Sequence, residues 1–395
     1  MRLQDTVFKR LGPDLWMYHT ASPYKVRVNG ETMARLESLL AKRPGEALAP
    51  EEEFLYGKLQ SKGMILPEPC SQRLRVKQKS LLDSIELEFS GSCNLACRHC
   101  FAAMSGGMMP PDTFAKVLDG ASELDAVTLI FSGGEPLLNP FFPQACLRAR
   151  AAGLKVIVMT NAAAVTDGLA GGMQSAGVAE AVVSLDSFQE HHDRLRGRGA
   201  FDAAVRGIRL LVGRRIPLYI TAMVTDRSIG SLPAFKEFCL ADLKVSGVRL
   251  SAVVPMGRAA QAGDELGLSA ADFAKVFPAD CPEAAGEPAQ GFKCSAGSRQ
   301  VFVSADGAVY ACHYFQNLGE PIGDLAREPL AGIYRRNAQD GLTSRFDRSS
   351  LHECRACSKY AACLGGCRAR AKILEGSICA PDPVSCRIHG LAVRS

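Results

Sequence analysis

Three cysteines, Cys93, Cys97 and Cys100, lie within the eight-residue segment CNLACRHC. A loop this short can point all three sulfurs at one iron–sulfur cube, whose usual protein ligands are thiolates. Three protein ligands leave one iron open to a small molecule. A zinc site with His99 as the fourth ligand is the alternative, since structural zinc takes four Cys or His ligands. The spacing favours the open cluster and so predicts chemistry as well as structure.

The segment FSGGEP, residues 131–136, supports this interpretation. It follows an apolar run over residues 127–131, which is typical of a buried strand. The adjacent Gly133 and Gly134 allow a ligand to approach the backbone closely. An amino group bound there would meet backbone carbonyls and Glu135 as hydrogen-bond acceptors. The segment therefore predicts a ligand-binding turn at the end of a strand.

The pattern C-x3-C-x2-C followed by GGEP resembles the radical S-adenosylmethionine (SAM) superfamily. The resemblance implies a [4Fe–4S] cluster on Cys93, Cys97 and Cys100, with SAM bound to the open iron through its amino and carboxylate groups. It also implies that the reduced cluster cleaves SAM to a 5′-deoxyadenosyl radical, which takes a hydrogen from the substrate.

Composition restricts the class of protein. The chain has 395 residues, 47% of them hydrophobic, which favours two or three domains. The net charge of +5 is diffuse and does not indicate nucleic-acid binding. Residues 1–16 lack the apolar stretch of a secretory signal, and no apolar run predicts a membrane span. The 15 cysteines therefore indicate metal binding in the cytoplasm rather than extracellular disulfides.

Residues 1–80 form the first expected unit, a small winged-helix-like module. Its layout resembles the peptide-recognition element of enzymes that modify ribosomally made peptides, which implies that the leader of a precursor peptide adds to an exposed sheet edge. A purely structural cap on the next domain is the alternative. The expected elements are strands over residues 7–18 and 24–28, helices over 31–41 and 51–62, an edge strand over 63–66 and a solvated linker over 71–79. The second helix is expected to bury Phe54, Leu55 and Leu59.

Residues 81–260 alternate between strand and helix patterns. Six such units in series predict an α/β fold with a parallel sheet and right-handed crossovers. Six strands are too few to close an eight-stranded TIM barrel, so we expect a partial, open (β/α)6 barrel. The motifs follow strands, and barrel enzymes carry their sites at the carboxyl ends of strands. The expected strands cover residues 85–89, 127–131, 155–160, 181–185, 218–224 and 247–254.

The resemblance to radical SAM enzymes implies further contacts for SAM at these strand ends. Motif alignment assigns the carboxylate and ribose of SAM to Ser184 and Arg196, because a guanidinium matches a carboxylate with two N–H groups. Asp186, at the end of the same strand, is another candidate. A solvated surface charge is the alternative for Arg196.

Two more candidates come from the same resemblance. Asn161 stands in the Thr-Asn-Gly turn of the family, although Ala162 replaces the usual glycine. His99 is assigned to the adenine of SAM, and the backbone of residues 255–258 is expected near it. His191 and His192 are expected to form a surface pair at the start of a helix.

Cysteines gather again after residue 290. Alternation around Asp306-Gly307 predicts a hairpin that brings Cys294 and Cys312 together. The remaining cysteines, which include a C-x2-C-x5-C-x3-C run, are Cys354, Cys357, Cys363, Cys367, Cys379 and Cys386. This arrangement resembles the SPASM extension of radical SAM enzymes, which implies two auxiliary [4Fe–4S] clusters within residues 291–395, after a connecting segment over 261–290. A structural zinc ribbon is the alternative.

The SPASM resemblance implies interleaved cluster ligands. The outer cluster would take Cys354, Cys357, Cys363 and Cys386, and the inner cluster Cys294, Cys312 and Cys367. Cys281 is the candidate for a fourth inner ligand, with an open iron as the alternative. Cys379 is the alternative to Cys386 as the last ligand of the outer cluster. We favour Cys386 because Cys386 follows the Asp-Pro pair that similar sequences show.

Together these features predict a radical SAM peptide maturase that installs a thioether or carbon–carbon cross-link, or a related oxidative modification, in a ribosomal precursor peptide. A reductant such as flavodoxin or ferredoxin would supply electrons. The alternatives are a sulfatase-type maturase, a tetrapyrrole- or haem-modifying enzyme, and a cluster-bearing redox or sensor protein without catalytic activity.

Overall fold

The structure is a computed structural model. It describes residues 2–43, 45–66, 74, 76–262, 266–268, 272, 276, 294–341 and 350–391. Most of the expected connecting segment 261–290, and Cys281 with it, lies outside the described residues.

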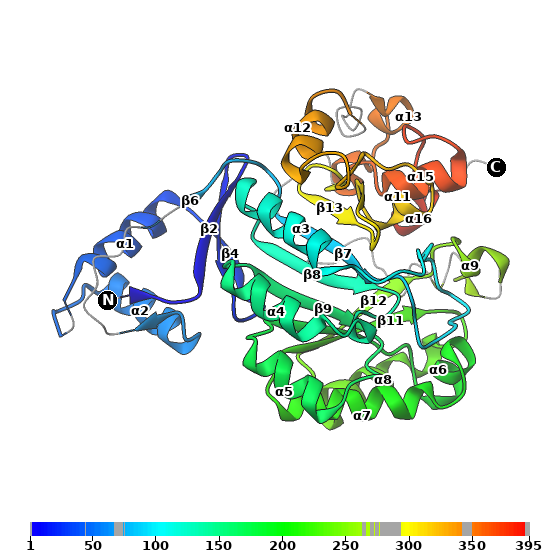
Figure 1. Cartoon of the computed structure of the whole chain (residues 1–395), viewed down its shortest axis with the longest axis horizontal. Coiled ribbons are helices and arrows are strands. Elements are labelled where there is room, and N and C mark those ends of the chain that lie inside the picture. The colour runs from blue at the N-terminus through cyan, green and yellow to red at the C-terminus, as the bar shows by residue number, and fades with distance from the viewer. Residues whose placement is uncertain are drawn as a thin grey trace.

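The N-terminal module combines small sheets with two helices (Figure 1). One sheet has the strand order β4-β3-β2-β6, and β1 pairs with β5. The single strand expected over residues 7–18 is wrong, because Gly12, with φ +63°, turns the chain there into a hairpin. The elements are β1 Arg2–Leu3, β2 Thr6–Leu11, β3 Asp14–His19, β4 Lys25–Val28, α1 Gly30–Ala41, α2 Pro50–Ser61, β5 Ile65–Leu66 and β6 Val76–Lys77.

Local chemistry explains the two helices of the module. The side chain of Asn29 accepts a hydrogen bond from the Thr32 N–H and so caps α1. α1 buries Leu36, Leu39 and Leu40 in the core of the module. The expected burial of Phe54 on α2 is wrong: its side chain is 65% exposed and lies under the ammonium of Lys58.

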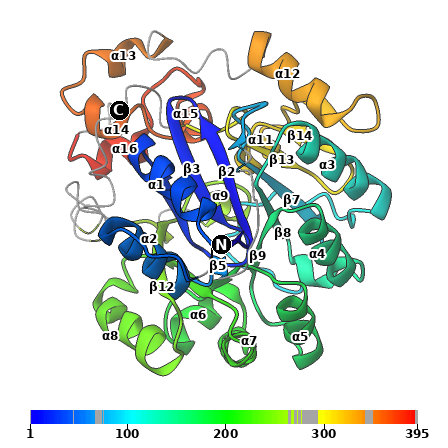
Figure 2. The ribbon, with the colours of Figure 1, turned by 90° about the vertical axis from the view of Figure 1, so that its left-hand side faces the viewer.

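The module docks on the amino ends of the barrel strands, as Figure 2 shows from the module side. Tyr18 Oη donates to Asp83 Oδ1 across 2.7 Å, just before the first barrel strand. Lys9 Nζ donates to the Asp125 carbonyl across 2.8 Å, before the second. Part of the expected linker is ordered as β6, which pairs with β2, so the solvated-linker interpretation is wrong for Val76–Lys77.

The central domain confirms the predicted partial barrel. Parallel strands pair in the order β12-β11-β10-β9-β8-β7, with helices on the outside (Figure 1). Its strands are β7 Ser84–Ser90, β8 Thr128–Gly133, β9 Lys155–Thr160, β10 Glu180–Ser184, β11 Leu218–Val224 and β12 Gly247–Ala252. Its helices are α3 Pro111–Glu123, α4 Phe142–Ala151, α5 Asp167–Ser175, α6 Gln189–Arg196, α7 Ala200–Gly213, α8 Leu232–Glu237 and α9 Arg258–Gln261.

The C-terminal domain extends the barrel sheet. The predicted hairpin forms, and its first strand, β13, also pairs in parallel with β7. An open barrel leaves the edge of its first strand available for such pairing. The elements are β13 Gln300–Val303, β14 Ala308–Tyr310, α11 His313–Gln316, β15 Gly323–Asp324, α12 Leu330–Asp340, α13 His352–Arg355, α14 Tyr360–Cys363, α15 Arg368–Glu375 and α16 Pro383–Ile388.

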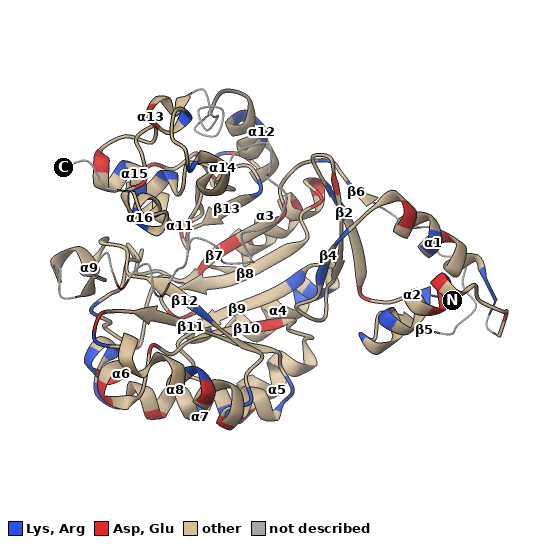
Figure 3. Ribbon diagram, turned by 180° about the vertical axis from the view of Figure 1, so that it is seen from behind, with Lys and Arg blue, Asp and Glu red and all other residues tan. Residues whose placement is uncertain are grey.

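Apolar residues fill the core of the barrel, and most charged residues lie outside it. Alternate β7 residues Ile85, Leu87 and Phe89 are fully buried in the main core. Figure 3 shows most charged positions on helices and loops around the sheet, with an acidic stretch on β7 itself. Among the described residues, no helix has the length and apolar character to cross a membrane.

Candidate active site

A cavity of about 310 Å³ opens at the carboxyl ends of the barrel strands. Most of the predicted site residues line it, although they come from distant parts of the sequence. Those residues are Cys93, Cys97, His99, Cys100, Gly133, Gly134, Asn161, Ser184 and Arg196. Glu135 and Asp186 are fully or almost fully buried and are not among the lining residues.

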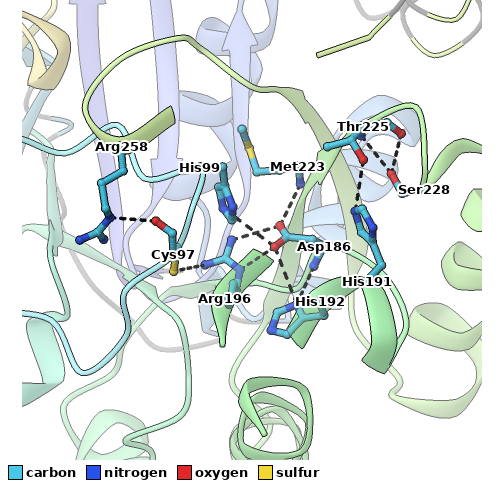
Figure 4. A network of polar contacts seen from close by, with 10 residues as sticks. All are labelled: Cys97, His99, Asp186, His191, His192, Arg196, Met223, Thr225, Ser228 and Arg258. Atoms are coloured by element: carbon cyan, nitrogen blue, oxygen red, sulfur yellow. Dashed lines mark hydrogen bonds and ion pairs between the residues drawn. The ribbon is translucent and has the colours of Figure 1, made fainter. Parts of the chain in front are cut away.

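Backbone hydrogen bonds fix the cysteine loop. The Arg98 N–H donates to the Leu195 carbonyl at 2.8 Å, and the Arg258 N–H to the Cys100 carbonyl at 2.9 Å. Arg258 Nε also donates to the Cys97 carbonyl at 2.9 Å (Figure 4). Gly257, with φ +53°, permits this approach, since a Cβ there would lie 2.8 Å from the Cys100 carbonyl oxygen. The turn at residues 255–258 therefore braces the cysteine loop.

The paired glycines have a steric reason within the chain itself. A Cβ on Gly133, where φ is +119°, would lie 2.4 Å from the Ser90 carbonyl oxygen. A Cβ on Gly134 would lie 2.4 Å from the Ser92 carbonyl oxygen. Glycine is required at both positions so that the end of β8 can lie against the segment leading to Cys93.

Glu135 links two strand ends. Its carboxylate accepts hydrogen bonds from Thr160 Oγ1 at 2.6 Å, the Asn161 N–H at 2.8 Å and the Leu137 N–H at 3.3 Å. Burial raises the pKa of Glu135 to about 7, against the opposing effect of these hydrogen bonds. The carboxylate thus positions the turn after β9 from behind the cavity wall.

That turn carries Asn161 to the cysteine loop. Asn161 Nδ2 donates to Asn94 Oδ1 at 2.8 Å and lies 3.8 Å from Cys93 Sγ. Ala162 has a φ of +60°, a left-handed conformation that favours glycine. The left-handed residue of this turn therefore lies where the Thr-Asn-Gly motif has its glycine.

Asp186 is the centre of the polar network in Figure 4. Its Oδ2 accepts from Arg196 Nε at 2.6 Å, and its Oδ1 from Arg196 Nη2 at 3.1 Å and the Met223 N–H at 3.1 Å. Burial alone would raise the pKa of Asp186, but the adjacent guanidinium holds it well below its usual range. The third guanidinium nitrogen, Nη1, faces Cys97 Sγ at 3.8 Å. Arg196 is thus a buried ion-pair partner, and its surface-charge alternative is wrong.

His192 contradicts the expected surface pair. It is 1% exposed, and its Nδ1 accepts a hydrogen bond from the Asp186 N–H at 3.1 Å, so the ring proton lies on Nε2. Burial lowers the pKa of His192 to about 4, which keeps the ring neutral. His191 is partly exposed and its Nε2 lies 3.2 Å from Thr225 Oγ1. No sequence signal separates the two histidines except position on the helix.

His99 is buried beside the same carboxylate. Its Nε2 lies 3.9 Å from Asp186 Oδ2, and its ring lines the cavity. Burial lowers the pKa of His99 to about 4, so the ring is neutral near pH 7.

Several cysteines of the C-terminal domain lie close to one another, and their division into two sets of cluster ligands stays a prediction. Cys294, Cys312 and Cys367 pack around Ala311, Phe315 and Ala369. Burial and then the neighbouring thiols raise the pKa of Cys386 to about 11, and those neighbours are Cys363, Cys354 and Cys357. Cys379 is not among the groups that influence Cys386 or Cys354.

The donor set fits iron–sulfur clusters. Both groups, like the cysteine loop, offer sulfur donors, which suit such clusters. Within the described ranges, no three Cys, His, Asp or Glu side chains are arranged to hold a single metal ion.

The C-terminal domain also supplies one wall of the cavity, which sequence reasoning missed. Phe302, His313, Tyr314 and Gln316 line it. His313, directly after Cys312, lies 3.0 Å through Nδ1 from Glu86 Oε2 on β7, and its ring centroid is 5.0 Å from that of Phe101. The sequence signal that could have placed His313 at the cavity is its position next to Cys312, a predicted cluster ligand.

Glu88, also on β7, connects the two domains directly. Its Oε1 accepts from the Ser105 N–H at 2.9 Å, in the loop after Cys100. Its Oε2 accepts from the Ala305 N–H at 3.1 Å, in the turn of the C-terminal hairpin. A carboxylate in the sheet interior therefore holds both loops.

Comparison with known proteins agrees with this architecture. Residues 87–239 match the radical SAM superfamily, and residues 294–358 match SPASM, an iron–sulfur cluster-binding domain. The AdoMet-dependent heme synthase of Methanosarcina barkeri is 28% identical over 76% of this chain and 95% of that protein. The mycofactocin maturase MftC of Mycobacterium ulcerans is 27% identical over 77% of this chain and 87% of that protein.

Among solved structures, Streptococcus suis SuiB bound to its precursor peptide SuiA superposes with a TM-score of 0.69 at 15% identity, covering 97% of this chain and 99% of SuiB. The likeness in fold therefore includes the N-terminal module. With both family matches on the domains that carry the clustered cysteines, this chain is a radical SAM enzyme with a SPASM domain.

Proposed function

We propose that this enzyme is a peptide maturase that cleaves SAM reductively and installs a thioether or carbon–carbon cross-link, or a related oxidative modification, in a ribosomal precursor peptide. The observation that supports it is the N-terminal module, whose sheet ends at β4 among the described strands. SuiB, which has a similar fold over nearly its whole length, was solved with a precursor peptide bound.

The cofactor set of this proposal is one SAM-binding [4Fe–4S] cluster and two auxiliary clusters. Cys93, Cys97 and Cys100 hold the first. The outer auxiliary cluster takes Cys354, Cys357, Cys363 and Cys386, and the inner one Cys294, Cys312 and Cys367. When bound, these groups supply the electron that splits SAM and an acceptor for the electron left on the substrate.

The residues of the chain position SAM and exclude water. Gly133 and Gly134 line the cavity with their backbone, which would receive the amino group of SAM, and Asn161 and Ser184 present polar groups from the next strand ends. Arg196, held by Asp186, presents Nη1 on the cavity side. His99 lies against the adenine. The SPASM wall closes the cavity over the substrate side chain.

The register of β3 and β4 defines how a leader peptide would bind. The His19 N–H donates to the Tyr24 carbonyl at 3.0 Å, and hydrogen-bonded pairs alternate along an antiparallel ladder. Val26 and Val28 therefore direct their backbone groups toward β3, while Lys25 directs its own away from β3. We propose that the leader pairs with that outer edge of β4.

The experiment is anaerobic co-expression with each short open reading frame beside the gene, followed by mass analysis. A maturase removes two hydrogen atoms per cross-link from one such peptide. A matched pair of variants then tests the leader site. Lys25→Pro removes the outward N–H, at a position where a strand tolerates proline. Lys25→Met keeps the N–H but, like Lys25→Pro, removes the ammonium with its ion pair to Asp83 and its contacts with the Trp16 and Tyr18 rings.

We expect Lys25→Pro to weaken peptide binding by about tenfold, which corresponds to about 1.4 kcal/mol, and Lys25→Met to change it much less. Equal affinity of the Lys25→Pro variant and the parent enzyme would exclude pairing at β4.

Haem synthesis is the second candidate, because the heme synthases are relatives over three quarters of this chain. In that case the enzyme would trim the propionates of an iron porphyrin with SAM and reductant, and Lys25→Pro would not alter the rate.

We place the enzyme in the cytoplasm, where flavodoxin or ferredoxin serves as the reductant and thiols stay reduced.

A further inference from the structure

Two glutamates of β7, Glu86 and Glu88, face the interior of the barrel and line the cavity. The apolar residues that alternate with them, Ile85, Leu87 and Phe89, face the core, because successive side chains of a strand point to opposite faces. Glu86 is 6% exposed and Glu88 1%. Two buried carboxylates therefore stand in the wall of the cavity that must also admit a substrate.

The two carboxylates differ in what balances their charge. Glu86 Oε2 lies 3.0 Å from His313 Nδ1, so this carboxylate has a histidine partner. Both oxygens of Glu88 accept hydrogen bonds, but only from the uncharged N–H groups of Ser105 and Ala305. In the part of the chain that the structure describes, Glu88 forms no ion pair. A carboxylate away from water requires an opposite charge nearby, and the chain does not supply one here.

The arginines of the cavity wall lie beside the cysteine loop instead. Arg196 and Arg258 both contact Cys97 (Figure 4). Arg196 Nη1 lies 3.8 Å from Cys97 Sγ, and Arg258 Nε donates to the Cys97 carbonyl at 2.9 Å. The cavity is therefore polarised, with positive charge beside Cys97 and negative charge on β7.

Aromatic rings of the C-terminal wall lie beside the carboxylates of β7. Phe302 on β13 is paired in register with Glu86, and Tyr314 follows on α11. The ring centroid of Tyr314 lies 5.1 Å from that of Phe101, and all three rings line the cavity. The face of an aromatic ring attracts a cation, and an aliphatic stem packs well against it. Rings and carboxylate together fit a side chain that is aliphatic along its length and cationic at its end.

We propose that the β7 side of the cavity is a subsite for a lysine or arginine side chain of the substrate peptide, with Glu88 as its counter-charge. The inference rests on the peptide-maturase function proposed above. The ammonium or guanidinium of the substrate completes the charge balance of Glu88, and its stem lies along the aromatic rings. An anionic group, such as a propionate of an iron porphyrin, would meet like charge there, which is unfavourable.

The first test uses the full-length, cluster-loaded enzyme with SAM and two small probes, Nα-acetyl-lysine methylamide and Nα-acetyl-norleucine methylamide, which differ in the terminal ammonium. In equilibrium dialysis we expect the lysine probe to bind at least about tenfold more tightly, because hydrogen bonds to charged groups are the stronger ones. Glu88→Gln should reduce this preference to about twofold or less. Asp306→Asn, which removes an exposed carboxylate from the same hairpin turn but outside the cavity wall, should leave it unchanged.

Equal affinity of the parent enzyme for the two probes would refute the subsite, and so would a preference for lysine that survives in Glu88→Gln. The affinity for SAM is measured in the same proteins. A loss of SAM affinity in Glu88→Gln with the lysine preference intact would assign Glu88 to SAM and contradict the proposal. Because the comparison of the two probes in the parent needs no variant, it decides the question even if Glu88→Gln does not load its clusters.

The second test uses the peptide that co-expression identifies. Replacing its lysines and arginines by glutamine, one at a time, should raise KM at least about tenfold at one position, and that replacement should cost little more in Glu88→Gln, because the pair is already broken. A peptide that keeps its KM through every replacement would refute the subsite and leave the maturase function standing. Turnover of an iron porphyrin without modification of any peptide would refute the maturase function, and the subsite with it, since that substrate carries carboxylates.

Discussion

Arg196 Nε lies 2.6 Å from Asp186 Oδ2, and this buried ion pair stands against the sulfur of Cys97. Two of the three guanidinium nitrogens are occupied by Asp186, which the Met223 N–H holds in turn. The arginine is therefore fixed before any ligand arrives. Its remaining nitrogen has a defined direction, as a preorganised site requires.

Breaking this pair should destabilise the protein strongly. Arg196→Met leaves the Asp186 carboxylate buried without its cation, so the free energy of unfolding of the cluster-free protein should fall by about 3 to 5 kcal/mol in chemical denaturation. The exposed pair of Arg214 and Asp167 is the control. Arg214→Met should leave the unfolding midpoint nearly unchanged, and an equal loss in both variants would contradict the role of the buried pair.

His192 should make stability depend on pH. The unfolded chain binds a proton on this ring near pH 6.5, but the folded chain only near pH 4, because burial lowers the pKa. As the pH falls through this window the unfolded state gains the proton first, so stability is lost, by up to about 3 kcal/mol. His192→Phe should be less stable at pH 7 but lose less on acidification. Parallel pH profiles for the two proteins would refute a neutral buried His192.

Ala162 is strained by its left-handed backbone, with φ at +60°. Ala162→Gly should therefore raise the free energy of unfolding by up to about 1 kcal/mol, since an L side chain is disfavoured there. The control is Ala163→Gly, at the next position, which is not among the residues with positive φ. It should lower stability by about 0.5 to 1 kcal/mol. Thermal melting of both variants measures these changes in stability. A similar loss of stability in the two variants would argue against backbone strain at Ala162.

Cys386 and Cys379 should differ in metal content. In our proposal Cys386 lies with Cys354, Cys357 and Cys363, and Cys379 is not among the groups that act on Cys386 or Cys354. Cys386→Ala should therefore lower the iron content of the reconstituted protein by up to about four atoms per chain, and Cys379→Ala should leave it unchanged. The reverse result would exchange their roles.

The parts of the fold that follow from local patterns could be predicted. Alternating apolar strands and helices specify the parallel sheet, and short cysteine spacings specify thiols on one loop. Gly133 and Gly134 also follow from sequence, although much of their steric need comes from Ser90 and Ser92 rather than from a ligand.

What could not be predicted depends on distant contacts. The pairing of β13 with β7 joins segments more than 200 residues apart, and nothing local in either strand specifies its partner. His191 and His192 are adjacent in sequence, yet only packing against Asp186 makes one of them a core residue. The hydrogen bond of Glu135 could not be predicted for the same reason, because its partner Thr160 lies on another strand.

We propose that Cys93, Cys97 and Cys100 hold a cluster with one iron open to SAM. The most direct measurement follows the paramagnetic resonance of the reduced, anaerobically reconstituted enzyme while SAM is added, and quantifies 5′-deoxyadenosine in the same samples. We expect a signal that changes when SAM is added and deoxyadenosine that forms in the same samples, and we expect both to be lost in Cys97→Ala. A spectrum that SAM leaves unmoved, or cleavage of SAM that survives replacement of all three cysteines by alanine, would contradict it.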